Sequence, residues 1–196
     1  LKGLGLENSQ NSIVLVPGNH DVDFRASSVP TLMCEFSNKI NITQNTALEG
    51  GNSLYGMNAF RLFAFELTGD INWVKSETLS WINNKLNHFG IRFIQLNTAH
   101  NISTTNINIP SINQDTIEQL TKDISNVKDL FTITISHHGP SEHTGSGEDN
   151  LEVDWAKLGQ LFRVSKTQLW LHGHGHGRVT VAQSIARSEN TFNISN

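Results

Sequence analysis

The sequence predicts an α/β fold in which helices pack on a sheet. Segments with the periodicity of amphipathic helices alternate with short apolar runs typical of strands, and three of these runs end in polar loops. The composition agrees, because 37% hydrophobic and 16% charged residues in a chain of 196 exclude a disordered chain and a coiled coil. Ligand sites of α/β sheets gather at the carboxyl ends of strands. We therefore expect the polar loops to meet at one edge of the sheet.

The first predicted strand is the apolar run "SIVLV" at residues 12–16, which ends at Pro17 and Gly18. No strand is predicted in residues 25–70. Within this region "MNAFRLFAFELTG", residues 57–69, predicts a helix. Its expected apolar side consists of Phe60, Phe63, Ala64 and Leu67. We interpret residues 25–70 as a helical excursion over the site.

Three pairs of a helix and a strand are predicted next. In the first, "SETLSWINNKLNHFG" begins at Ser76 as N-cap and ends at Gly90 as C-cap, and the strand "IRFIQLNT" follows at residues 91–98. The apolar face of this predicted helix is formed by Leu79, Ile82, Leu86 and Phe89.

The second and third pairs repeat this order. The second helix carries Ile117, Leu120, Ile124 and Val127 on one face, and "FTITIS" at residues 131–136 is its strand. The third helix is marked by Trp155, Leu158 and Phe162, and "TQLWL" at residues 167–171 is its strand. Residues 178–183 and 191–195 are predicted to be short strands of a closing sheet.

Charge and cysteine content limit the classes of function. A formal net charge of −4 argues against a surface that holds nucleic acid by neutralising phosphates. Cys34 is the only cysteine, which excludes an intrachain disulfide and favours a reducing compartment, so we expect a cytoplasmic location. No run is long and apolar enough to span a bilayer, so no membrane partner is expected.

Three polar loops follow predicted strands, and they contain six of the nine histidines. The loops read "GNHD" at residues 18–21, "HHGP" at 137–140 and "HGHGHG" at 172–177. Their histidines are His20, His137, His138, His172, His174 and His176. Histidine is the commonest metal ligand among side chains, so convergence of these loops would create a metal site.

Each loop alone also has an ordinary interpretation. "HGHGHG" suits a surface loop with adventitious metal affinity, "GNHD" a polar turn and "HHGP" a loop before a proline turn. In an extended segment, however, His172, His174 and His176 point to one side, and the intervening glycines let a metal or a phosphate approach the backbone. The three loops together are far more specific than any one of them.

The ordered set "GNHD", "HHGP" and "GHGH" resembles the calcineurin-like metallophosphoesterase superfamily. The resemblance extends from about Ser12 to the end of the chain, and "VPGNHDVD" is most similar to bacterial phosphoesterase modules attached to larger proteins. It implies a β-sandwich flanked by helices (αββα) with a two-metal site. We therefore expect residues 1–196 to form a single domain.

The resemblance also implies a role for each motif residue. The implied metal ligands are Asn19, through its amide oxygen, His137, His174 and His176. His20 would bond the phosphate and protonate the leaving oxygen, and Asp21 would hold His20 in its tautomer. His138 would lie beside the ligands, and His172 would be structural.

Two motifs of the family pattern, "D-x-H" and "G-D-x-x-[DN]", are not found before "GNHD". "GDIN" at residues 69–72 comes after "GNHD", and Trp73 follows it where an acid or amide is expected. We expect the chain to lack its first strands, and upstream sequence or further domains of the same protein to supply the remaining ligands. The fragment alone would then be inactive. The alternative is a decayed domain with a single-metal or metal-free site.

The predicted function is metal-dependent hydrolysis of a phosphomonoester or phosphodiester by two divalent ions. Ligation by nitrogen and oxygen suits Mn, Fe, Zn or Ni. The substrate stays open among monoesters, cyclic nucleotides and nucleic acid, the last not indicated by the charge. One rival is a non-catalytic binding or regulatory module with an incomplete metal site. Another is a histidine-rich metal-binding protein, against which "GNHD" argues.

Overall fold

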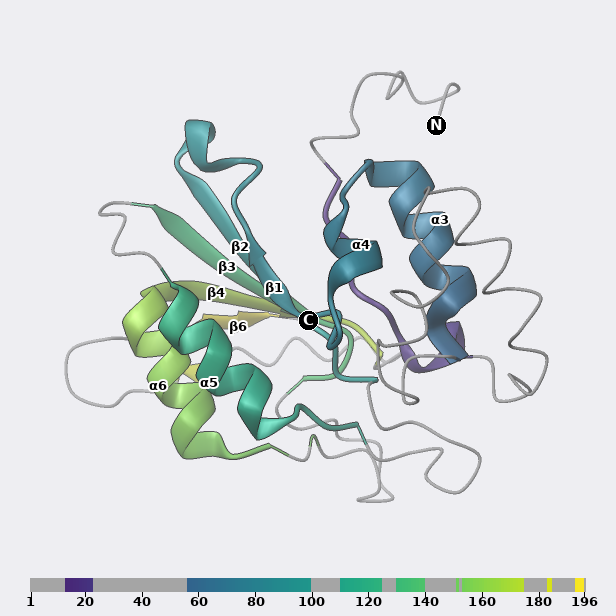
Figure 1. Ribbon diagram of the computed structural model, residues 1–196. Coiled ribbons are helices and arrows are strands. Elements are labelled where there is room, and N and C mark those ends of the chain that lie inside the picture. The colour runs from purple at the N-terminus through teal and green to yellow at the C-terminus, as the bar shows by residue number, and fades with distance from the viewer. Residues whose placement is uncertain are drawn as a thin grey trace.

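Within the described residues the strands form a six-stranded sheet with helices on both faces (Figure 1). This computed structural model describes residues 13–22, 56–99, 110–124, 130–139, 151, 153–174, 183–184 and 193–195. The strands are β1 (Trp81–Asn83), β2 (Ile91–Leu96), β3 (Phe131–Ser136), β4 (Thr167–His172), β5 (Gln183–Ser184) and β6 (Asn193–Ser195). The helices are α3 (Asn58–Thr68), α4 (Asn72–Lys75), α5 (Gln114–Asp123) and α6 (Trp155–Ser165), with 3-10 turns η3 (Asn19–Asp21) and η6 (Asn87–Phe89).

The strand order is β1-β2-β3-β4-β6-β5. Strands β2, β3, β4 and β6 run parallel, and the edge strands β1 and β5 pair antiparallel with their neighbours. The carboxyl ends of β2, β3 and β4 therefore lie at the same edge of the sheet. The predicted α/β class with helices that flank a sheet is confirmed. The described strands belong to one sheet, so the second sheet of the predicted αββα sandwich is not seen within the described residues.

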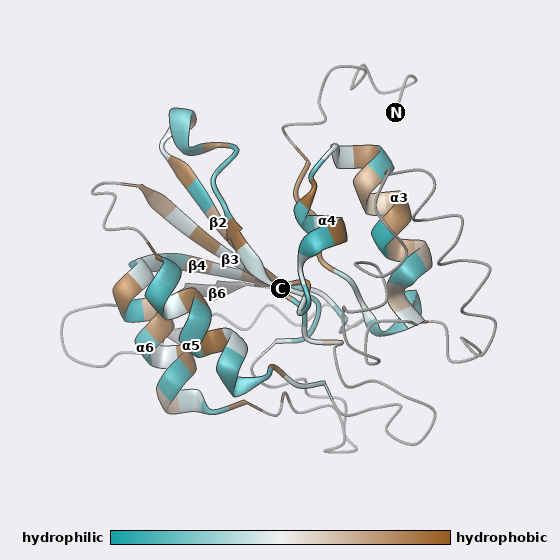
Figure 2. Ribbon diagram, in the orientation of Figure 1, coloured by the Kyte–Doolittle hydropathy of each residue, from teal (hydrophilic) through white to brown (hydrophobic). Residues whose placement is uncertain are grey.

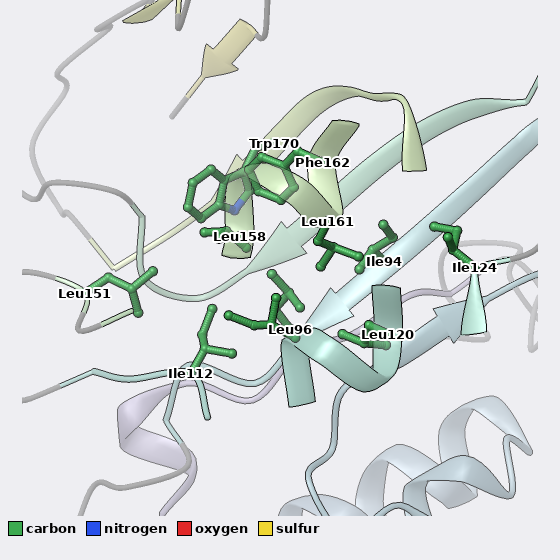
Figure 3. Packing of buried hydrophobic residues seen from close by; sticks show 11 residues of the cluster. Ile94, Leu96, Ile112, Leu120, Ile124, Leu151, Leu158, Leu161, Phe162 and Trp170 are labelled. Atoms are coloured by element: carbon green, nitrogen blue, oxygen red, sulfur yellow. The ribbon is translucent and has the colours of Figure 1, made fainter. Parts of the chain in front are cut away.

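One face of the sheet is covered by α5 and α6 through an apolar core (Figure 3). Ile94 and Leu96 of β2 point to this face, where they meet Leu158 and Leu161 of α6. Figure 2 shows α5 and α6 to be hydrophilic over much of their surface with hydrophobic residues between, as helices that lie on a sheet require. Trp170 of β4 joins the same core, so this layer fixes the strands whose ends carry histidines.

The other face is covered by α3 and α4, which lie away from α5 and α6 in Figure 1. Trp81 of β1 is directly opposite Gln95 of β2, so both side chains point to this face. Trp73 of α4 packs edge-on against Trp81 with ring centroids 4.6 Å apart, and Ala64 of α3 is buried in the same cluster. The sheet therefore has a separate core on each face.

Several predicted elements are confirmed. Strands β2, β3 and β4 fall where apolar runs predicted them, and β6 lies inside residues 191–195. Strand β5 overlaps the predicted segment 178–183 only at Gln183. Helix α5 buries Ile117 and Leu120 as predicted, and Ile124 is buried at its C-cap. Val127 lies outside the described residues.

Helix α6 is confirmed as well. It begins where Asp154 accepts hydrogen bonds from Ala156 and Lys157 backbone N–H groups, at 3.0 and 3.2 Å. Leu158 and Phe162 are buried, whereas Trp155 at the first position is 46% exposed. The apolar face therefore begins one turn later than predicted.

The helix predicted over residues 76–90 is wrong. The structure has strand β1 and turn η6 there instead. The decisive pattern has a period of two, because Trp81 and Asn83 are buried towards one face while Ile82 packs against the core on the other. Ser76 accepts a hydrogen bond from the Leu79 N–H at 2.9 Å, but this closes a turn rather than a helix.

The strand predicted at residues 12–16 is also wrong, since residues 13–18 have no regular secondary structure. A strand needs a neighbouring strand for its backbone groups, and within the described residues this segment joins no ladder. It is attached to the sheet by the Gln95 side chain, which donates through Nε2 to the Leu15 carbonyl at 2.5 Å.

The predicted apolar side of α3 is confirmed only in part, because Ala64 is buried and Phe60 packs against the same cluster, whereas Phe63 does not. Arg61 is buried at 4% exposure, whereas Phe63 is 54% exposed. Arg61 donates through Nε to the Trp73 carbonyl at 2.8 Å and through Nη2 to the Val74 carbonyl at 2.5 Å. These hydrogen bonds between α3 and α4 determine which side of α3 faces the protein interior. Helix α3 falls within the predicted excursion at 25–70, of which residues 25–55 lie outside the described residues.

Candidate metal centre

The loops after β3 and β4 begin at the same point of the sheet. Ser136 at the end of β3 is paired with His172 at the end of β4. The Gly173 N–H then donates to the His137 carbonyl at 2.9 Å, which fixes one loop to the other beyond the last ladder pair. The two histidine loops are therefore held together by the sheet itself.

Three side chains from three loops converge beside this point. His137 Nε2 lies 2.9 Å from Asn19 Oδ1 and 3.1 Å from His174 Nδ1. Asn19 reaches it from η3, at the end of the segment that Gln95 attaches to the sheet. The structure thus brings together three of the four predicted metal ligands. The fourth, His176, lies outside the described residues.

The donor set fits a cation. An Asn oxygen has only lone pairs to offer, and His137 Nε2 has at most one hydrogen for two neighbours. The separations of 2.9 and 3.1 Å also match two ligands about 90° apart around an octahedral ion, which lie about 3 Å from each other when each is about 2.1 Å from the metal. A divalent ion would satisfy all three donor atoms at once.

His138 lies beside these donors and is buried, at 2% exposure. One ring nitrogen of each of His137, His138 and His174 lies within 4.8 Å of the others. His138 Nδ1 is 2.8 Å from Thr98 Oγ1, and its backbone N–H donates to the same oxygen at 3.1 Å. Burial, followed by the neighbouring His137 and His174, lowers the pKa of His138 to about 3, so this ring is neutral at pH 7.

Two glycines make room for histidine rings. A Cβ on Gly18 would lie 2.9 Å from the His137 ring, and a Cβ on Gly139 would lie 2.4 Å from the His172 ring. Burial lowers the pKa of His172, whose Nδ1 is buried without a partner recorded among the described residues. The glycines of "GNHD" and "HHGP" are therefore required by close approach of a ring to the backbone.

His174 has a backbone φ of 72°, in the left-handed region that residues other than glycine rarely adopt. Such a conformation costs of order 1–3 kcal/mol and is retained where the surroundings enforce it. Here it places the ring nitrogen against His137.

The other predicted catalytic residues occupy η3. His20 is exposed and directly follows Asn19. Asp21 accepts a hydrogen bond from the Gly18 N–H at 2.8 Å, which closes the turn. Among the described residues this is the partner recorded for the Asp21 carboxylate, so its predicted action on the His20 tautomer stays a prediction.

Sequence reasoning missed Thr98. It follows β2 in "LNTAH", where a single threonine carries no signal of a site. Its partner His138 was expected only to lie beside the ligands. The pairing of β2 with β3, which sets Leu96 opposite Ser136, is what brings Thr98 to His138, and that pairing is visible only in the folded chain.

A family model described as calcineurin-like phosphoesterase matches residues 2–178. No curated protein and no solved structure matches the chain. None of the helices in the part of the chain that the structure describes has the length and apolar character needed to cross a membrane.

Proposed function

The chain belongs to the calcineurin-like phosphoesterase family, and we propose that it hydrolyses a phosphoester with the help of divalent metal ions. The observation that supports this most is the convergence of Asn19, His137 and His174 from three separate loops. A histidine-rich surface loop would not recruit an asparagine 118 residues away from His137.

Asn19, His137 and His174 would hold one ion. His176 would reach a second ion. The proposed ions are Mn, Fe, Zn or Ni, since the donors are nitrogen and oxygen. When bound, the metal polarises the phosphoryl oxygens and stabilises the charge that develops on them.

The chain's own residues would handle the leaving group. His20 is exposed beside the ligand Asn19, where a substrate can reach it, and it would protonate the leaving oxygen. Asp21 contributes by closing the η3 turn on the Gly18 N–H, which fixes the backbone that presents His20.

The proposed substrate is a phosphoester, and its class is limited by the net charge of the chain. The site suits phosphomonoesters and phosphodiesters alike. A net charge of −4 disfavours long nucleic acid unless another domain supplies a basic surface. The single cysteine, Cys34, supports a reducing, cytoplasmic setting.

The proposal is tested by hydrolysis of bis(4-nitrophenyl) phosphate with Mn²⁺. We expect turnover that depends on added Mn²⁺ and is abolished by a chelator. Turnover that is unaffected by a chelator would contradict the ligand assignment. A protein that binds no metal would support a non-catalytic binding module instead.

Variants separate the roles at the site. His20→Ala should lower turnover roughly a hundredfold while metal content stays near normal. His174→Ala should lose metal as well as rate. His88→Ala is the matched control, because His88 is exposed in η6 and its ring lies against Phe89, with ring centroids 4.0 Å apart. If His20→Ala strips the metal as completely as His174→Ala, then His20 is itself a ligand.

A further inference from the structure

We propose that His138 presents a neutral Nε2–H group as a hydrogen-bond donor to an anionic oxygen of the substrate, and that Thr98 fixes its proton there. The inference rests on the proposed phosphoester hydrolysis and adds a residue that contacts the substrate. His138 differs in this from its neighbours His137 and His174, which are proposed to offer lone pairs to a metal.

The backbone N–H of His138 can only donate, so its hydrogen bond of 3.1 Å makes Thr98 Oγ1 an acceptor. The Thr98 hydroxyl still has one hydrogen to place. Thr98 is fully buried, at 0% exposure, and within the described residues the structure records no acceptor for this hydrogen other than His138 Nδ1 at 2.8 Å.

A buried hydroxyl hydrogen without an acceptor is unfavourable, so Thr98 donates to Nδ1. Nδ1 then uses its lone pair, and the single proton of the neutral ring resides on Nε2. One threonine hydroxyl, fixed by a backbone amide, therefore selects the tautomer of His138.

This tautomer decides what His138 can do. A protonated Nε2 has no lone pair for a metal, although the ring lies among the metal ligands, with centroids 4.5 Å from His174 and 4.7 Å from His137. A phosphoryl group held at the neighbouring donors would bring an anionic oxygen next to this N–H. A fixed donor in a buried site stabilises such an oxygen without reorganisation. Thr98 is the positioning residue for this donor.

The tautomer can be observed directly by long-range ¹H–¹⁵N correlation on protein with ¹⁵N-labelled histidine. We expect a protonated Nε2 and an unprotonated Nδ1 for His138 in the metal-free protein. Thr98→Ser should preserve this pattern, and Thr98→Val should produce a mixture of tautomers. A proton on Nδ1 in the unaltered protein overturns the proposal, and so does a Thr98→Val spectrum that is unchanged.

The donor role is tested by calorimetric titration of the metal-loaded protein with inorganic phosphate. Thr98→Val should weaken phosphate binding roughly tenfold, as expected for loss of a hydrogen bond to a charged group, while Thr98→Ser stays close to the unaltered protein. Metal affinity, measured without phosphate, should be equal in all three. If His138→Phe loses the metal, or if phosphate binds equally to all forms or to none, the proposal is overturned.

These outcomes are distinct from failure of the proposed function. A protein that binds no metal at Asn19, His137 and His174 contradicts the proposed function, whatever the tautomer of His138. The spectrum of the unaltered, metal-free protein tests the tautomer even if a Thr98 variant fails to fold.

Discussion

The candidate metal centre has two parts that are held in place by different means. The strand-end arm, which consists of His137, His138 and His174, follows β3 and β4 and inherits its position from a parallel ladder. The turn arm, residues 13–22 with Asn19, joins no ladder within the described residues. It is attached by the Gln95 hydrogen bond to Leu15 and by apolar packing of Leu15 and Val22 in the cluster around Trp73. One part of the site is therefore positioned by strand pairing, whereas the other is held by a side-chain hydrogen bond and apolar packing. Metal binding should therefore stabilise the turn arm most.

The largest effect is expected where the two arms meet. His137→Ala removes the nitrogen that contacts both Asn19 and His174, so we expect divalent metal affinity to fall by at least about a hundredfold. Isothermal titration with Zn²⁺ measures this, with His88→Ala as control. Equal affinities for the two variants would place the metal elsewhere.

Lowering the pH should reduce the free energy of unfolding through His138, which belongs to the strand-end arm. The folded pKa of His138 is lowered to about 3 from 6.5, so the unfolded chain binds the additional proton first as pH falls. The free energy of unfolding should thus decrease as pH drops from about 6.5 towards 3, with a slope of at most about 1.4 kcal/mol per pH unit from this group.

Denaturant unfolding of the metal-free protein at pH 7 and pH 5 checks this, with His138→Phe for comparison. The variant should show a shallower dependence on pH. If its slope equals that of the unaltered protein, His138 is not the group responsible.

Gly18→Ala tests the contact between the arms. Gly18 has φ of −104°, which alanine also adopts, so the new Cβ at 2.9 Å from the His137 ring is the main change. We expect a destabilisation of about 1–3 kcal/mol, as for other overpacked sites, together with weaker metal binding.

The matched control is Gly159→Ala in α6, where an added Cβ meets nothing within 4 Å. There the helix should gain about 0.5–1 kcal/mol, because alanine is a better helix former than glycine. Thermal unfolding of both variants gives the comparison. Similar shifts in the two would mean that Gly18 does not support His137.

A comparable effect should come from Gln95→Met, which removes the donor to the Leu15 carbonyl and also the acceptor of the buried Asn83 amide, 2.7 Å away. We expect a loss of about 1–3 kcal/mol in stability, because a buried amide is left without its acceptor. Hydrogen exchange should become faster in residues 13–18 and stay the same in β3 and β4. Faster exchange in β3 would show that the two arms are not held independently.

The difference between elements defined by local patterns and segments held by distant contacts explains how far the sequence alone could predict the structure. Strands β3 and β4 and helix α5 are specified by local apolar patterns, so periodicity predicted both them and the convergence of their loops. Residues 76–90 satisfy a helical pattern as well, but pairing with β2 overrides it, because Trp81 is buried on one face of the sheet and Ile82 packs against the core on the other. Local periodicity cannot decide between these outcomes without the partner strand.

Hydrogen bonds between distant segments are the second feature that the sequence alone did not indicate. Nothing in "MNAFRLFAFELTG" indicates that Arg61 would be buried by carbonyls of Trp73 and Val74, and nothing in "LNT" indicates that Thr98 would meet His138. The motifs predicted which residues reach the site. The hydrogen bonds that orient them depend on contacts between distant segments and became visible only in the folded chain.

Anomalous diffraction from crystals of the Zn²⁺-loaded protein shows whether these three side chains hold a metal. We expect a zinc peak bonded to Asn19 Oδ1, His137 Nε2 and His174 Nδ1, with the His138 ring beside it and not coordinated. A peak that lacks Asn19, one that is bonded to His138, or no peak at this edge of the sheet would overturn the proposed metal centre.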